Sequence, residues 1–308
     1  MRAGAGTYAR LTKISDEWLR NAYAGFPEEI VSDFGRRHFT LWTAILARIF
    51  GREWVERHVL NPNSSEAIGF LKLDFSADQA RERKSLRLGL LAEMLLNLQN
   101  VPGFEHPVAQ MRNGQIESGF AELEFGKLLY VNDIEFRFVD PRGRKKGEAY
   151  DFELTYPDGV IVCADAKCKL EGSQPNLTSL KHSLRDASRQ LPKNRPSVIF
   201  VKVPQHWIET SGVYEAMGDE TRRFLNGTKR IVSVKYYSSM EEFRPDGILL
   251  THQYREISNP GNRFDTTRDW ALFQSPSSPT SAWNGLPPKW KRLIRLPDGP
   301  LRFDEHDQ

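Results

Sequence analysis

Hydrophobic residues recur at helical spacing through the first hundred positions of the chain. Ser15 can cap a first helix, and apolar side chains repeat three or four residues apart in the segment 34–49. The segment 80–99 has the same spacing, with its apolar side chains on one side, and ends before Pro102-Gly103. We therefore predict an N-terminal helical region over residues 1–108.

The pattern then changes to strands separated by helices. The segment 116–130 has apolar residues around most of a helical circumference, which predicts a largely enclosed helix. Alternating or apolar runs predict strands, two of which form a hairpin through Pro157-Asp158-Gly159; these strands cover 133–139, 150–156, 160–168, 197–203, 231–237 and 247–251. The segment 177–191 predicts a helix that stops at Pro192. This alternation indicates an α/β fold.

The last part of the chain has a different composition. From about residue 256 it becomes rich in Pro and Ser, with Asn and Gly between them, which favours loops over regular elements. Trp270, Trp283 and Trp290 argue against complete disorder. We therefore divide the chain into residues 1–108, a central domain over 109–255, and a C-terminal extension over 256–308.

Composition limits the class of protein. The chain is 39% hydrophobic and 27% charged, its mean hydropathy is −0.53, and its longest mostly apolar stretch, 39–50, is well short of the ~20 residues that span a bilayer. The first residues lack the apolar core of a secretory signal. We expect a soluble, cytoplasmic protein with no membrane partner.

The cysteines argue against a disulfide and against structural zinc. Cys163 and Cys168 fall on one predicted strand and would lie about 16 Å apart at roughly 3.3 Å per residue. Two cysteines and seven scattered histidines offer too little clustering for a four-ligand zinc site. Any metal in this protein is therefore expected to be held by oxygen atoms.

Charged residues converge at the end of the predicted hairpin. Asp165 and Lys167 are two apart on an otherwise apolar strand and so share one face, and the neighbouring strand can bring Asp151 beside them. Two enclosed carboxylates repel each other unless a cation lies between them. The sequence therefore predicts a site for Mg²⁺, with Mn²⁺ as a substitute.

These residues resemble the PD-(D/E)xK nuclease family, which has the restriction endonuclease-like fold. Asp151 matches the first acidic position of its motif and Asp165-Ala166-Lys167 the second element; a helix with a Glu precedes them and the crossover through 177–191 follows. Tyr150 stands where the motif often has Pro. The resemblance covers residues 116–203, and implies a mixed β-sheet flanked by helices within the domain 109–255.

The resemblance also implies roles for single residues. Asp151 and Asp165 would bind Mg²⁺, with the main-chain carbonyl of Ala166 as a further oxygen ligand. Lys167 would orient a water molecule and stabilise negative charge on a phosphate. These groups would hydrolyse a phosphodiester bond.

Two further residues complete the implied site. Glu122, on the preceding helix, would hold a water molecule or help to place a second ion, and Gln190 resembles a glutamine that some members place beside the site. Helical periodicity alone leaves the choice between Glu122 and Glu124 open, and the family spacing favours Glu122.

The substrate class has weaker support. The chain is mildly basic, with a formal charge of +3, and the segment 167–202 holds eight basic residues against two acidic ones. Lys181, Arg185 and Arg189 on the predicted helix are candidate contacts to nucleic acid backbone, independent of base sequence. DNA is favoured over RNA through the resemblance alone.

We therefore expect a metal-dependent DNA endonuclease of the defence, mobile-element or repair type. A homodimer would suit it, since two strands need two cuts. The alternatives are a catalytically silent protein on the same fold, which binds nucleic acid or a protein partner, and an RNase.

Overall fold

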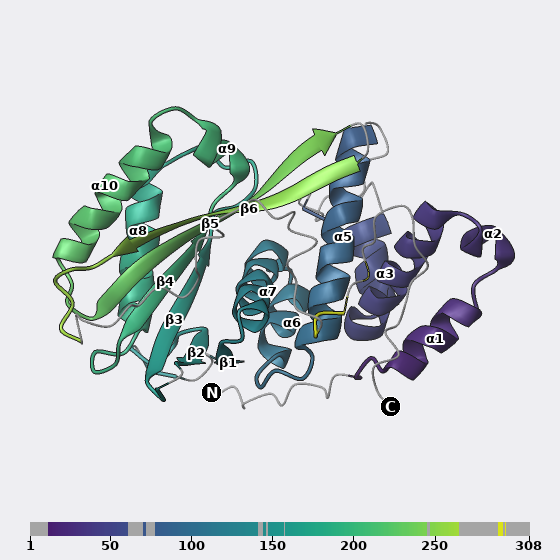
Figure 1. The fold of residues 1–308 in the computed structure, drawn as a ribbon, viewed down its shortest axis with the longest axis horizontal. Helices are drawn as coiled ribbons and strands as arrows, with labels where there is room; N and C mark the ends of the chain where they lie inside the picture. Colours follow the sequence, from purple (N-terminus) through teal and green to yellow (C-terminus); the bar gives the residue numbers. More distant parts are fainter. Residues whose placement is uncertain are drawn as a thin grey trace, which may run out of the picture. The chain divides into compact units, whose positions relative to one another are not determined.

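The computed structural model describes residues 12–60, 70–71, 78–140, 144–145, 147–156, 158–244, 247–264, 289–291 and 293 (Figure 1). For residues 34, 78–84 and 240–252 within these ranges, the structure describes the backbone alone. Most of the predicted C-terminal extension falls outside the described residues. No helix in the described part is both long and apolar enough to cross a membrane.

The protein has an α/β fold: an N-terminal helical region precedes a six-stranded mixed sheet with interspersed helices (Figure 1). The chain forms two compact units, one of residues 1–100, 112–116 and 287–308, and one of residues 101–111 and 117–286. The α/β prediction is therefore confirmed.

The first unit is helical. Its elements are α1 (Asp16–Ala24), α2 (Glu28–Val31), α3 (Phe34–Phe50), α4 (Arg52–Val55), the π-helical turn Glu56–Leu60 and α5 (Asp78–Leu98). Ser15 caps α1 as predicted, since its hydroxyl accepts a hydrogen bond from the Trp18 N–H at 3.1 Å. In α5 the predicted apolar side is buried, but Leu88 and Leu96 elsewhere on the helix are buried too. This helix is therefore more enclosed than its pattern predicted.

A short piece of the C-terminal extension packs on α5. The carboxylate of Glu93 is 1% exposed and accepts hydrogen bonds from the Trp290 indole at 3.2 Å and the Leu293 N–H at 2.7 Å. Asn97 also bonds the main chain of Lys291 in both directions. These contacts satisfy polar groups that would be costly to bury alone.

The second unit contains the sheet. Its elements are α6 (Glu105–Arg112), α7 (Ile116–Val131), β1 (Glu135–Phe138), β2 (Phe152–Thr155), β3 (Ile161–Cys168), α8 (Leu177–Gln190), β4 (Ser197–Lys202), α9 (Gln205–Glu209), α10 (Val213–Asn226), β5 (Ile231–Arg244) and β6 (Gly247–Ser258). The strands lie in chain order from β1 to β6. β3, β4 and β5 are parallel to one another, and the other neighbours are antiparallel.

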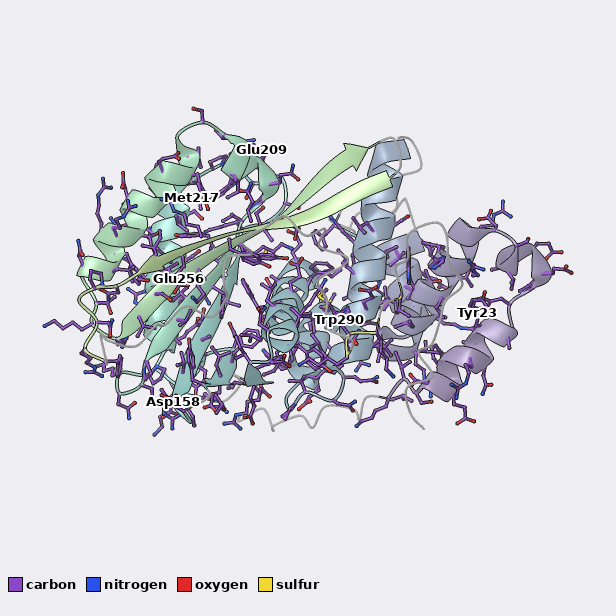
Figure 2. All side chains as sticks on the ribbon, in the orientation of Figure 1. Tyr23, Asp158, Glu209, Met217, Glu256 and Trp290 are labelled. Atoms are coloured by element: carbon purple, nitrogen blue, oxygen red, sulfur yellow. The ribbon has the colours of Figure 1, made fainter. Side chains whose placement is uncertain are left out.

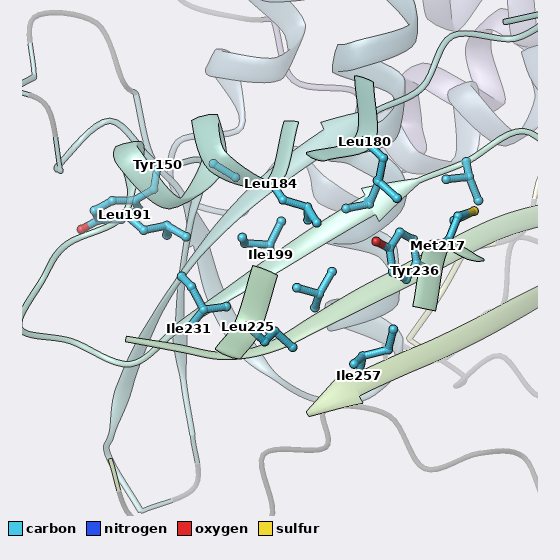
Figure 3. Close-up of a cluster of buried hydrophobic side chains, with 14 of the residues drawn as sticks. Tyr150, Leu180, Leu184, Leu191, Ile199, Met217, Leu225, Ile231, Tyr236 and Ile257 are labelled. Atoms are coloured by element: carbon cyan, nitrogen blue, oxygen red, sulfur yellow. The ribbon is translucent and has the colours of Figure 1, made fainter. Parts of the chain in front are cut away.

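Helices cover both faces of this sheet (Figure 1). Phe125 of α7 packs on Phe200 of β4, with ring centroids 4.5 Å apart. The neighbouring residue Ile199 instead joins Leu180 and Leu184 of α8 in a buried cluster (Figure 3). Since successive residues of a strand point to opposite faces, α7 and α8 cover opposite faces.

The α8 face has the larger apolar cluster. Met217 of α10, labelled in Figures 2 and 3, is buried there with Tyr236 of β5 and Ile257 of β6. The hydroxyl groups of Tyr236 and Thr221 lie 2.5 Å apart, which satisfies both inside the core. This packing holds α10 on β5 and β6, while α8 packs on β3 and β4.

Several elements differ from the predicted ones. α6, α9 and α10 were not predicted, and β5 and β6 extend well beyond their predicted ends, β6 past residue 255. Both cysteines are free, as predicted. Cys163 and Cys168 are five apart and therefore lie on opposite faces of β3.

Candidate metal centre

The β2–β3 hairpin brings the first two acidic residues together. The Asp151 N–H donates to the Ala164 carbonyl at 3.0 Å, and the Asp151 Oδ2 accepts a hydrogen bond from the Ala166 N–H at 2.7 Å. The Asp151 carboxylate therefore lies against the peptide that joins Asp165 to Ala166.

Asp165 and Lys167 share one face of β3, as their spacing predicted. Lys167 Nζ lies 2.5 Å from Asp165 Oδ1 and donates a hydrogen bond to Gln190 Oε1 at 2.6 Å. Asp165 is fully buried, and its Oδ2 has no hydrogen-bond partner among the described residues. Lys167 therefore contacts two other predicted site residues, Asp165 and Gln190.

Glu122 of α7 lies close to Asp151, with ligand atoms of the two residues within 4.8 Å of each other. Its Oε1 accepts a hydrogen bond from Gln110 Nε2 at 2.7 Å, whereas its Oε2 is buried without such a partner in the described part of the chain. A buried, unsatisfied carboxylate oxygen is costly. A bound cation would satisfy the Glu122 Oε2 atom.

His106 was not predicted as a site residue. One ligand atom from each of His106, Glu122 and Asp151 lies within 4.8 Å of the others, and all three residues are buried. His106 and Gln110 are four apart on α6 and so lie on one side of that helix. Helical spacing would have placed His106 and Gln110 on one side only after residues 105–112 had been recognised as a helix.

Gln110 links His106 to Glu122. Its Nε2 lies 2.7 Å from His106 Nε2 and donates to Glu122 Oε1 at 2.7 Å. An imidazole nitrogen binds a metal through its lone pair, so Nε2 of His106 would exchange the Gln110 contact for the ion. His106 thus offers a nitrogen donor beside a site that was predicted from oxygen donors alone.

The second glutamate of α7 lies elsewhere. Glu124 is two residues from Glu122 and so points to nearly the opposite side of the helix. It forms an ion pair with Lys202 of β4 and accepts a hydrogen bond from the Ser239 hydroxyl at 3.1 Å. The structure therefore groups Glu122, and not Glu124, with the aspartates.

The main-chain carbonyl of Ala166 lies on the appropriate edge of β3. In a strand, the N–H and C=O of one residue point the same way. The Ala166 N–H points to Asp151, so its carbonyl faces the same edge. The carbonyl therefore lies on the side of β3 that faces Asp151.

Burial and mutual repulsion raise the pKa values of the acidic groups. Burial, and then the charge of Asp151, raise the pKa of Asp165 to about 8. Burial also raises the pKa of Asp151, and raises that of Glu122 well above its ordinary value. Although burial opposes it, the charges of Asp165 and Asp151 raise the pKa of Lys167. One ammonium group is thus too little positive charge for three enclosed carboxylates.

α8 is held where its last turn can reach the centre. Asn176 caps its first turn by accepting from the Ser179 N–H at 2.9 Å. Lys169, just beyond β3, donates to the Ser179 carbonyl at 2.9 Å and to the Ser183 hydroxyl at 2.7 Å. These bonds tie α8 to β3, so that Gln190 at its end meets Lys167.

The predicted nucleic-acid contacts lie on the outer side of α8. Lys181 is 3.5 Å from Glu220 of α10, and Arg189 pairs with Asp186 at 3.0 Å. Arg185 is exposed. None of the three touches the carboxylates, and all three line a cavity between α8 and α10.

Comparisons with protein-family models, curated proteins and solved structures found no match for this chain. The interpretation of the centre therefore depends on its own groups. His106, Glu122 and Asp151 have ligand atoms within 4.8 Å of one another and could hold a divalent cation. Asp165 is not part of this group, and it pairs with the amine of Lys167 at 2.5 Å.

Proposed function

We propose that the protein is a Mg²⁺-dependent nuclease that hydrolyses phosphodiester bonds, with DNA as its substrate and internal cleavage as its mode. The observation that supports this most is the excess of buried negative charge beside a single amine. Asp151, Asp165 and Glu122 are all buried, and within the described residues Glu122 Oε2 and Asp165 Oδ2 have no hydrogen-bond partner. Lys167 pairs with Asp165 at 2.5 Å.

The residues fit a divalent cation. Asp151, Asp165 and the Ala166 carbonyl offer hard oxygen ligands, and Glu122 with His106 completes a donor set on the α6 and α7 side. Mg²⁺ accepts oxygen ligands most readily, and an imidazole also suits Mn²⁺. When bound, such an ion would polarise the phosphate and lower the pKa of a water molecule toward neutral pH.

Lys167 supplies the positive charge that would act on the phosphate. Its raised pKa keeps it protonated, so it stabilises negative charge that develops on the phosphate oxygens. Gln190 Oε1 accepts one of its protons and so orients the ammonium. Gln190 is thus a positioning residue, which acts through Lys167.

The order of elements supports the same proposal. α7 carries a site glutamate, the β2–β3 hairpin carries Asp151 and the Asp165-Ala166-Lys167 run, and α8 crosses to the parallel strand β4. This is the order of the PD-(D/E)xK nucleases and of the restriction endonuclease-like fold. We propose membership of that family on these residues.

Plasmid cleavage tests the proposal. We expect the protein to nick or linearise supercoiled DNA with Mg²⁺ or Mn²⁺ and to be inactive in EDTA. Asp165→Asn should lower the rate by about 100-fold or more, since it removes a charged ligand without changing shape. Asp158→Asn, at the exposed hairpin turn labelled in Figure 2, is the matched control and should cleave normally.

RNA serves as the second substrate. Cleavage of RNA alone would make the protein an RNase on the same fold. If neither polymer is cut with any of these ions, the enzymatic proposal is wrong and a binding function takes its place.

A further inference from the structure

A strongly basic cavity lies between α8, α10 and the start of β5. Its volume is about 720 Å³, and of its thirteen lining residues eight are Lys or Arg and one is acidic. Arg185 and Arg189 come from α8, Arg223 comes from α10, Arg230 precedes β5, and Arg263 follows β6. Cations drawn from four parts of the chain therefore meet in one hollow.

A second cavity of about 810 Å³ continues from the first. The two share Arg189, Lys193 and Arg230, and the second adds Arg144 and Arg195 together with Glu148 and Glu153. We call the two cavities together the basic trough. Its shared residues make it one continuous basic surface.

Several cations of the trough have no carboxylate partner in the described part of the chain, namely Arg185, Lys193, Lys229, Arg230 and Arg263. Elsewhere on this surface the pairing is regular, since Glu220 pairs with both Lys181 and Arg223. Burial, and then the charge of Arg263, lower the pKa of Arg230. Uncompensated like charges in a concave surface favour a bound anion.

Two residues that line the trough are chain neighbours of residues in the candidate metal centre. Its lining includes Tyr150, which directly precedes Asp151 in the chain. It also includes Arg189, which directly precedes Gln190, the residue that accepts a hydrogen bond from Lys167. Two residues of the centre are thus chain neighbours of two trough residues.

We propose that the basic trough binds the phosphodiester backbone of the nucleic acid and leads it to the metal centre. This inference depends on the proposed function, and it adds Lys193, Lys229, Arg230 and Arg263 to the contacts predicted on α8. A cavity of this size accepts one strand of backbone, whether that strand is single or belongs to a duplex whose other strand lies outside. Such contacts bind independently of base sequence.

The test measures binding separately from cleavage. A triple variant, Arg185→Gln, Lys193→Gln and Arg263→Gln, removes three exposed cations of the trough. Its matched control carries the same change at three exposed arginines outside the trough, Arg20, Arg36 and Arg222. Binding of fluorescent 20-nucleotide single-stranded DNA and of a 20-base-pair duplex is measured by anisotropy in EDTA, with the salt varied.

For the trough variant we expect affinity to fall on the order of tenfold, and the slope of log K against log [salt] for single-stranded DNA to become shallower by about 2, from three lost contacts at 0.7 each. The control should bind as the wild type does. Equal losses in the two folded variants would overturn the inference, as would no loss in either. Losing single-strand but not duplex binding identifies the strand as single.

The two proposals fail differently. If the trough variant loses binding but the wild type cuts nothing with Mg²⁺, the trough stands and the nuclease proposal falls. If the wild type cuts DNA and the trough variant binds and cuts it equally well, the nuclease stands and the trough inference is wrong. Thermal unfolding of each variant checks that it is folded.

Discussion

The Ala166 N–H donates a hydrogen bond to Asp151 Oδ2 at 2.7 Å, which ties the carboxylate of one hairpin strand to the main chain of the other. This bond decides where the Asp151 charge lies, because it fixes the side chain against the peptide that follows Asp165. Burial, and then the nearby charge of Asp151, oppose ionisation of Asp165 and raise its pKa.

Asp151→Asn should separate charge from geometry. The amide oxygen of Asn can still accept from the Ala166 N–H, so the hairpin should keep its shape while one metal ligand loses its charge. We expect Mn²⁺ affinity, measured by calorimetry, to fall by about 10-fold or more. Asp158→Asn, in the turn of the same hairpin, should bind Mn²⁺ as the wild type does; an unchanged affinity in Asp151→Asn would remove Asp151 from the site.

The metal-free protein should lose stability as the pH rises. The folded pKa of Asp165 is about 8 and its unfolded value is near 4, so the folded state binds more protons between these values. The stabilisation that protonated Asp165 contributes is therefore fully present below about pH 4 and is lost as the pH rises to about 8. This group alone should lower the unfolding free energy by at least about 1 kcal/mol between pH 5 and pH 8.

Thermal unfolding in EDTA measures this effect. The midpoint should fall by at least a few degrees over the same interval, at roughly 2–4 °C per kcal/mol. Asp165→Asn should flatten the profile, and saturating Mn²⁺ should raise the wild-type midpoint most at high pH. An EDTA profile that rises from pH 5 to pH 8 would contradict the assignment.

His106→Ala tests whether the imidazole belongs to the donor set. Because nitrogen donors matter more to Mn²⁺ and Co²⁺ than to Mg²⁺, the variant should lose affinity for Co²⁺ by about 10-fold and for Mg²⁺ by less. His182→Ala, on the exposed surface of α8, is the control. Equal Co²⁺ binding by the two variants would assign His106 to packing alone.

Sequence reasoning recovered the part of this molecule that depends on local pattern. The alternation of β3 placed Asp165 and Lys167 on one face, and the hairpin turn brought Asp151 to them, as the structure shows. It missed His106, because α6 is short and has Pro107 in its first turn, so the sequence shows no helical periodicity there. Such a contact depends on tertiary packing, which a single sequence does not encode locally.

The basic trough was missed for a similar reason. The basic side of α8 was visible in the sequence, but Arg230 and Arg263 join it only through the packing of α10 and the order of the strands. Charges that lie far apart in the chain become one surface only after the fold is known. The long pairing of β5 with β6 was underestimated likewise, since a pairing partner extends a strand beyond its own apolar run.

The two glutamates of α7 give the sharpest comparison, since they differ in position by half a helical turn and in partner. Glu122→Gln should lower DNA cleavage by about 100-fold or more without lowering the stability of the metal-free protein, because it removes one of three mutually repelling charges. Glu124→Gln should leave cleavage within a few-fold of wild type but cost about 1–3 kcal/mol, because it weakens the buried pair with Lys202. Urea unfolding and plasmid cleavage on both variants measure the two effects. The reverse result, with cleavage lost in Glu124→Gln and kept in Glu122→Gln, would move the catalytic carboxylate to the opposite side of the helix and so away from Asp151.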